Sequence, residues 1–90
     1  MIIKNADVFT EEGMFERKDV AISGELFSET AVDDEVIDGS DCWLIPGLTD
    51  IHFHGCMGYD FCDGTEEAIQ AIADYEASVG VTTIVPATMT

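Results

Sequence analysis

One segment, residues 46–86, constrains the fold most, because it reads in order as strand, loop, helix and strand. Pro46-Gly47 is a turn that starts an apolar run ending at His54. A loop that contains Gly55, Gly58 and Gly64 follows. Residues 81–85 are apolar and mostly β-branched, and Pro86 stops them. This order over about 40 residues predicts a βαβ unit with parallel strands and a right-handed crossover.

Residues 65–79 carry the pattern of an amphipathic helix. Thr65 is a suitable N-cap, acidic residues follow it in the first turn, and Gly80 is a suitable residue just after the helix. A helical stripe should face the core, formed by Ile69, Ile72, Tyr75 (or Glu76) and Val79 with small alanines between them. The stripe indicates ordinary core packing and carries no functional prediction.

His52 and His54 are the only two histidines in the chain. Side chains at i and i+2 of a strand point to the same face, so Asp50, His52 and His54 are predicted to share one face. Two imidazoles and a carboxylate make a good start on a divalent-metal site. The alternative is a histidine pair on an ordinary surface strand. The position at the C-terminal end of a strand, below a glycine-rich loop, favours the metal site, because a (β/α)8 barrel carries its chemistry there.

Residues 1–45 read as short strands separated by turns, which predicts a layer of a small β-sandwich. The first strand covers residues 2–8, and a hairpin turns at Ser23-Gly24 between residues 20–22 and 26–27. Residues 36–38 form a further short strand, and Gly39-Ser40-Asp41 turns the chain into residues 42–45.

Charge and cysteine content exclude several functions. The chain has 19 acidic and 3 basic residues, a net charge of −16, which argues against nucleic acid and anionic membranes as partners. Three cysteines without a secretory leader or a long apolar run predict a reduced, cytoplasmic protein. The spacing of Cys56 and Cys62 fits no usual structural zinc pattern. Asp60 and Asp63 lack the ligand pattern of a calcium loop and favour a hydrogen-bonded turn.

The segment Pro46–Gly55 (PGLTDIHFHG) resembles the first barrel strand of the amidohydrolase superfamily. Residues 55–65 (GCMGYDFCDGT) and 80–90 (GVTTIVPATMT) are similar to the N-acetylglucosamine-6-phosphate deacetylase family, and residues 2–10 are similar to the first strand of its small β-domain. The resemblance implies an α/β fold. Residues 1–45 are then N-terminal strands of a small β-sandwich domain, and residues 46–90 are the first βαβ unit of an incomplete (β/α)8 TIM-type barrel.

The resemblance also implies a function. Family members release acetate from a phosphorylated amino sugar, N-acetylglucosamine 6-phosphate. His52 and His54 match metal ligands, which implies one or two divalent ions, zinc or iron. Asp50 is expected to support the ligands from just below the site, and Gly55 and Asp60 are expected to shape the loop. The other ligands and the catalytic aspartate come from later strands, so we expect no catalytic residue here, an N-terminal fragment that is inactive alone, and a homo-oligomer.

Two alternatives remain open. The first is another amidohydrolase, of the dihydroorotase, hydantoinase or aminoacylase type. Dihydroorotases commonly place an arginine two residues after the second histidine, where this chain has Cys56, so that type is disfavoured. The second is a non-catalytic remnant that self-associates, because two barrel strands without neighbours leave edges and apolar faces open.

Overall fold

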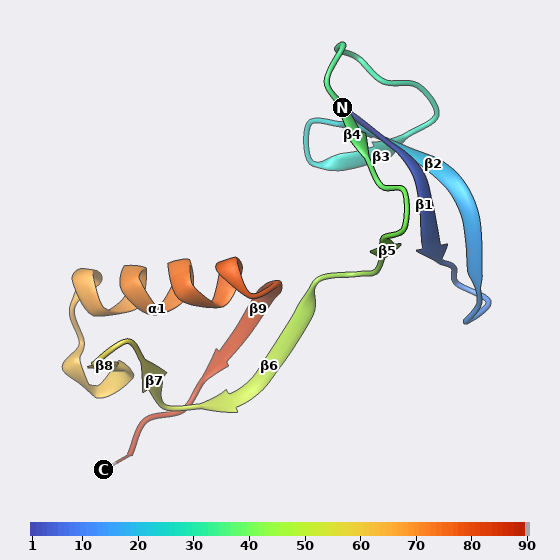
Figure 1. The fold of residues 1–90 in the computed structure, drawn as a ribbon. Coiled ribbons are helices and arrows are strands. Elements are labelled where there is room, and N and C mark those ends of the chain that lie inside the picture. The colour runs from blue at the N-terminus through green and yellow to red at the C-terminus, as the bar shows by residue number, and fades with distance from the viewer. Residues whose placement is uncertain (90) are drawn as a thin grey trace. The chain divides into compact units, whose positions relative to one another are not determined.

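The computed structural model describes residues 1–89 and divides the chain into two compact units, Met1–Pro46 and Gly47–Thr90 (Figure 1). Thr90, the last residue of the 80–90 motif, lies outside the described residues. The first unit contains β1 (Ile2–Phe9), β2 (Phe15–Ser23), β3 (Leu26–Ser28), β4 (Val36–Asp38) and β5 (Trp43–Leu44). The second contains β6 (Leu48–Phe53), β7 (Gly55–Cys56), β8 (Tyr59–Asp60), the 3₁₀-helix η1 (Phe61–Asp63), α1 (Glu66–Ser78) and β9 (Val81–Pro86).

The first unit is a single five-stranded sheet built around β1. The strand order is β3-β2-β1-β4, and β5 pairs with β1 further along the same strand. The β1–β2 and β2–β3 pairs are antiparallel, whereas β4 and β5 run parallel to β1. The predicted strands and hairpin are confirmed, but β2 begins at Phe15, well before the predicted start, because its charged residues pair in register with β1. A second layer, and so the sandwich, stays a prediction.

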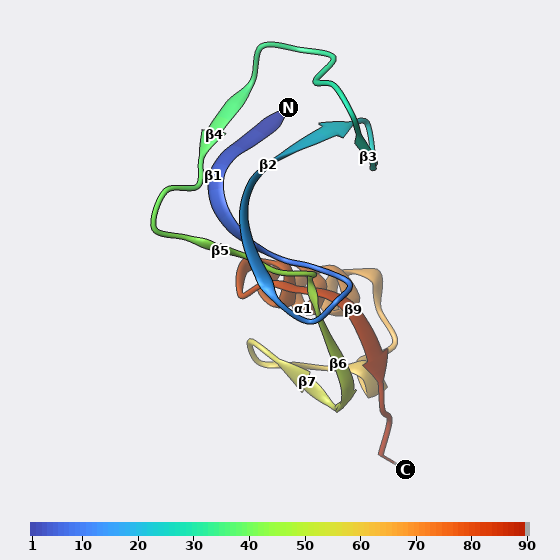
Figure 2. The ribbon, with the colours of Figure 1, turned by 90° about the vertical axis from the view of Figure 1, so that its right-hand side faces the viewer.

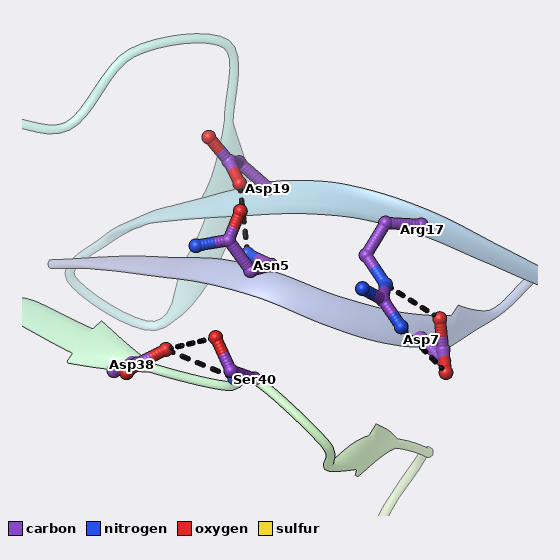
Figure 3. Close-up of polar contacts among 6 residues, drawn as sticks. All are labelled: Asn5, Asp7, Arg17, Asp19, Asp38 and Ser40. Atoms are coloured by element: carbon purple, nitrogen blue, oxygen red, sulfur yellow. Dashed lines mark hydrogen bonds and ion pairs between the residues drawn. The ribbon is translucent and has the colours of Figure 1, made fainter.

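A bulge in β1 accompanies the bend of the β1–β2 pair, which Figure 2 shows. The register shifts between Ile3 and Ala6, and Asn5 there has a positive φ of 62°. Asparagine tolerates this left-handed conformation better than most residues. The amide of Asn5, freed from the ladder, donates to Asp19 Oδ1 at 3.0 Å (Figure 3). The bulge is therefore held in place by a specific side chain of β2.

A second polar contact between these strands gives a pH prediction. Arg17 donates from Nε to Asp7 Oδ1 at 2.8 Å and from a terminal nitrogen to Oδ2 at 3.3 Å (Figure 3). The hydrogen bond from Arg17 holds the pKa of Asp7 below its ordinary value of 3.8. The contribution of this contact to the stability of the folded state is present above pH 3.8. It is lost as the pH falls through the lower pKa that Asp7 has in the folded protein. An NMR titration of the Asp7 carboxyl carbon should give a midpoint below 3.8.

Two variants separate the effect of the Arg17–Asp7 hydrogen bond on the pKa of Asp7 from the effect of nearby positive charge. Arg17→Gln should return the Asp7 midpoint toward 3.8, whereas Lys18→Gln removes a neighbouring positive charge without touching the bond and should leave it low. Equal midpoints in the wild type and Arg17→Gln would contradict the assignment.

The second unit contains the predicted strand–helix–strand order. β6 and β9 pair in parallel, with Leu48 opposite Val81 and Phe53 opposite Pro86, and α1 lies between them in sequence. α1 packs on β9 and on the β7–β8 hairpin, as Figure 1 shows. The parallel pair confirms this part of the prediction. The barrel stays a prediction.

The buried face of α1 agrees with the predicted stripe at Ile72 and Glu76 and differs from it at Ile69 and Val79. Thr65 caps the helix as expected, accepting from the amide of Ala68 at 3.2 Å, and Gly80 follows it at φ 90°. The buried positions are Ala68, Ile72 and Glu76, whereas Ile69 and Val79 are 49% and 53% exposed. The buried face of the helix is therefore centred on Ile72, with Ala68 and Glu76 one turn before and after it. None of the described helices is long and apolar enough to cross a membrane.

Candidate functional site

The two histidines lie together where β6 ends. His52 is near the end of the strand and His54 is the first residue beyond it. Their ring centroids are 5.1 Å apart and the ring planes are nearly perpendicular, at 84°. His54 is half-buried and His52 is exposed. The strand therefore presents two imidazoles as neighbours at the C-terminal end of a parallel pair.

β6 is bulged in the stretch that carries His52, near the end of its pairing with β9. Asp50 pairs with Ile84 and Phe53 pairs with Pro86, so the stretch from Asp50 to Phe53 is one residue longer than its partner. Asp50 Oδ1 accepts from the backbone amide of His52 at 3.1 Å. Asp50 thus holds the backbone of His52, a candidate metal ligand. Its contribution to a metal site stays a prediction.

The ring of His54 is oriented by the residue that follows β9. Its Nδ1 lies 2.9 Å from the carbonyl oxygen of Ala87. A carbonyl can only accept, so Nδ1 carries the hydrogen, and in the neutral ring Nε2 then keeps its lone pair. Metal-binding histidines commonly make this kind of bond with the nitrogen that does not bind metal. His54 is therefore in a suitable state for an ion at Nε2.

The β7–β8 hairpin follows directly and turns at Met57-Gly58, where both residues have positive φ, 56° and 80°. Gly55 has φ 155°, and a Cβ there would overlap the carbonyl oxygen of Tyr59 and lie 2.8 Å from Cα of Asp60. Only glycine allows the two strands to approach this closely. Gly55 thus sets the direction of the chain immediately after His54.

Asp60 begins η1 as a cap. Its Oδ1 accepts from the amide of Cys62 at 2.7 Å, and its own amide donates to Asp63 Oδ2 at 2.9 Å. The bond from Cys62 lowers the pKa of Asp60 below its ordinary value. Phe61, the next residue, donates its amide to the carbonyl of His54 at 3.0 Å. The loop beyond the histidines is therefore bonded back to them.

The donor set fits a metal ion in part. Two neutral imidazoles suit zinc and iron, but a catalytic zinc site uses about three protein ligands. Within residues 1–89 no group of three or more His, Cys, Asp or Glu side chains is arranged to hold an ion. Burial raises the pKa of the Cys56 thiol, and the charge of Glu76 adds to this, so Cys56 is poorly suited to bind as a thiolate. A site built on His52 and His54 needs at least one more ligand.

A hollow elsewhere in the molecule lacks this chemistry. It occupies about 850 Å³ in the first unit and is lined by apolar and charged side chains of β1, β2, β3 and β5 together with acidic residues of the β1–β2 turn. Neither histidine lines it. The candidate site therefore remains the end of β6.

Sequence reasoning did not identify Ala87 or Phe61 as residues that orient His54. A signal for Ala87 was present, because the ends of adjacent parallel strands lie side by side and Ala87 directly follows β9. Phe61 carried no such signal, since its amide reaches His54 only through the tight β7–β8 turn.

Comparison with known proteins connects this site to a group of hydrolases. The chain is 43% identical over 47 residues to N-acetylglucosamine-6-phosphate deacetylase of Vibrio furnissii, covering 52% of this chain and 12% of that enzyme. It is 29% identical over 97 residues to the enzyme of that name from Lysinibacillus sphaericus, covering 100% and 24%. It is 40% identical over 82 residues to dihydropyrimidinase 1 of Caenorhabditis elegans, covering 77% and 17%.

The chain therefore spans less than a quarter of the length of these relatives. No family model matches it, and no solved structure matches it significantly. Both kinds of relative are hydrolases of the amidohydrolase superfamily, and the partial matches fit its N-terminal portion. The predicted resemblance is confirmed at this level.

Proposed function

We propose that this chain, a relative of the N-terminal part of amidohydrolases, supplies the first metal-binding strand of N-acetylglucosamine-6-phosphate deacetylase. The observation that carries the proposal is the pair His52 and His54 at the end of β6. The rings are 5.1 Å apart, and the Nδ1 of His54 is engaged by Ala87. The complete protein would release acetate from N-acetylglucosamine 6-phosphate.

A bound divalent ion would polarise an amide carbonyl and make water a stronger nucleophile near neutral pH. The residues of this chain would hold and orient that ion. His52 and His54 would donate ring nitrogens, the Ala87 carbonyl would keep His54 in the right tautomer, and Asp50 would hold the backbone at His52. We assign the proton transfers of the reaction to none of these residues.

The substrate phosphate would be recognised by residues outside the second unit. Residues 47–90 contain no lysine or arginine, and the three basic residues of the chain, Lys4, Arg17 and Lys18, lie in the first unit. The acidic second unit would repel a phosphate unless an ion or other basic groups compensate. A cytoplasmic location and a homo-oligomeric state are further parts of this proposal.

A dihydropyrimidinase-type function is the second candidate. The identity to the Caenorhabditis elegans protein, 40% over 77% of this chain, favours it. The deacetylase is preferred because residues 55–65 and 80–90 resemble that family and because one deacetylase aligns with the whole chain.

A substrate assay separates the two candidates. The protein expressed from its own natural gene should release acetate from N-acetylglucosamine 6-phosphate after loading with zinc or iron, and it should leave 5,6-dihydrouracil intact. A version with His52→Ala and His54→Ala is the matched control and should be inactive. Hydrolysis of dihydrouracil without acetate release would favour the second candidate, and activity that survives both substitutions would reject the metal role of the pair.

A further inference from the structure

We propose that Cys62 is a positioning residue for His54, because its thiol fixes the segment after β9 that presents the Ala87 carbonyl to the ring. Cys62 does not touch the proposed ion. The significance of this contact for catalysis rests on the proposed metal role of His54, but the contact can be measured without a metal.

The thiol makes two bonds to one residue. Cys62 Sγ donates to the carbonyl oxygen of Met89 at 3.1 Å and accepts from the amide of Met89 at 3.3 Å. A thiol is a weak donor and a weak acceptor, so each bond alone is modest. Together they bind both polar groups of a backbone position that lies beyond the end of β9. The segment 87–89 is therefore attached to η1 as well as to β6.

These bonds complete a closed circuit around His54. The amide of Ala87 donates to the carbonyl of Phe53 at 2.9 Å, and the His54 ring donates to the carbonyl of Ala87 at 2.9 Å. On the other side, the amide of Phe61 donates to the carbonyl of His54 at 3.0 Å, and Cys62 is the next residue. The circuit runs from the His54 ring through residues 87–89 to Cys62, and back through Phe61 to the His54 backbone.

The position of Cys62 within η1 is itself well determined. Its amide donates to Asp60 Oδ1 at 2.7 Å, and the rings of Phe53 and Phe61 pack edge to face with centroids 5.1 Å apart. Because the backbone of Cys62 is held in this way, its thiol can restrain Met89. Among the hydrogen bonds of residues 1–89, opening the circuit at Cys62 leaves those of Ala87 to hold the segment 87–89, so the carbonyl that selects the His54 tautomer gains freedom.

The test compares Cys62→Ala, Cys62→Ser and Cys42→Ala in the full chain without metal. Hydrogen exchange of the Met89 amide reports on the thiol bonds, and the ring ¹⁵N and ¹³Cδ2 shifts of His54 report on its tautomer. Cys62→Ala should speed exchange at Met89 by roughly fivefold and populate the Nε2–H tautomer. Cys62→Ser, which keeps a donor and an acceptor, should restore much of both readouts. Cys42, an exposed cysteine in the first unit, should be neutral.

Several results would overturn the proposal. These are an unchanged tautomer and unchanged exchange in Cys62→Ala, a serine variant as impaired as the alanine variant, or an Nε2–H tautomer in the wild type. The last needs no variant and applies even where a substitution unfolds the chain. A zinc titration of the protein expressed from its own natural gene tests the proposed function separately. If Cys62→Ala changes the His54 tautomer but the wild type does not bind zinc, the positioning role of Cys62 stands and the metal role of His54 is rejected. If the wild type binds zinc but Cys62→Ala leaves the tautomer unchanged, the metal role stands and the positioning role is rejected.

Discussion

Replacing Gly55 by alanine is expected to destabilise the second unit by about 3 kcal/mol or more, one of the two largest effects predicted for this chain. The added Cβ would overlap the carbonyl of Tyr59 and lie 2.8 Å from Cα of Asp60. The contacts are backbone atoms of β8 and cannot move aside without opening the hairpin. The bond from Phe61 to the carbonyl of His54 should then be lost as well.

Gly58 is the matched control for this substitution. It lies in the same hairpin with φ 80°, and a Cβ there meets nothing within 4 Å. Gly58→Ala should therefore cost only the backbone strain, about 1 kcal/mol. Chemical denaturation followed by NMR signals of Tyr59 and Tyr75 reports on the second unit, while Trp43 fluorescence reports on the first. Equal costs for the two substitutions would show that the close approach of β7 and β8 is not required.

Removal of either histidine is expected to lower the affinity of the protein expressed from its own natural gene for zinc by more than about 100-fold, because loss of a direct ligand exceeds the cost of losing a supporting residue. The two variants should differ in stability. His52 is exposed, so His52→Ala should change the free energy of unfolding by less than about 0.5 kcal/mol. His54→Ala loses the bond to Ala87 and should cost about 1 kcal/mol.

Calorimetric titration with zinc and denaturation of the same samples provide both measurements. Cys42→Ala is a suitable control. Cys42 lies in the first unit, and its thiol is another side chain that can bind a metal ion. A loss of zinc affinity in the control equal to that of the histidine variants would place the binding elsewhere in the chain. Full affinity in either histidine variant would show that the pair does not act together.

Local patterns were sufficient for the order and type of most elements. The apolar β-branched run before Pro86, the cap at Thr65 and the hairpin near Gly24 are local signals, and β9, α1 and the β2–β3 turn appear where they predict. The βαβ order then required β6 and β9 to be parallel, because a helical connection returns the chain to the same end of the sheet. The β7–β8 hairpin was missed, since its turn residue Met57 is unusual at positive φ.

The sequence by itself thus determined the strand–helix–strand order, the histidine pair and the likeness to amidohydrolases. Only the tertiary structure decided how these parts meet. The exposure of Ile69 and Val79 on α1 depends on which strands pack against the helix, and the bulge after Asp50 depends on pairing with β9. The tautomer of His54 depends on Ala87, 33 positions away in the chain. Periodicity describes one element at a time, whereas a hydrogen bond between distant residues exists only once both elements are placed.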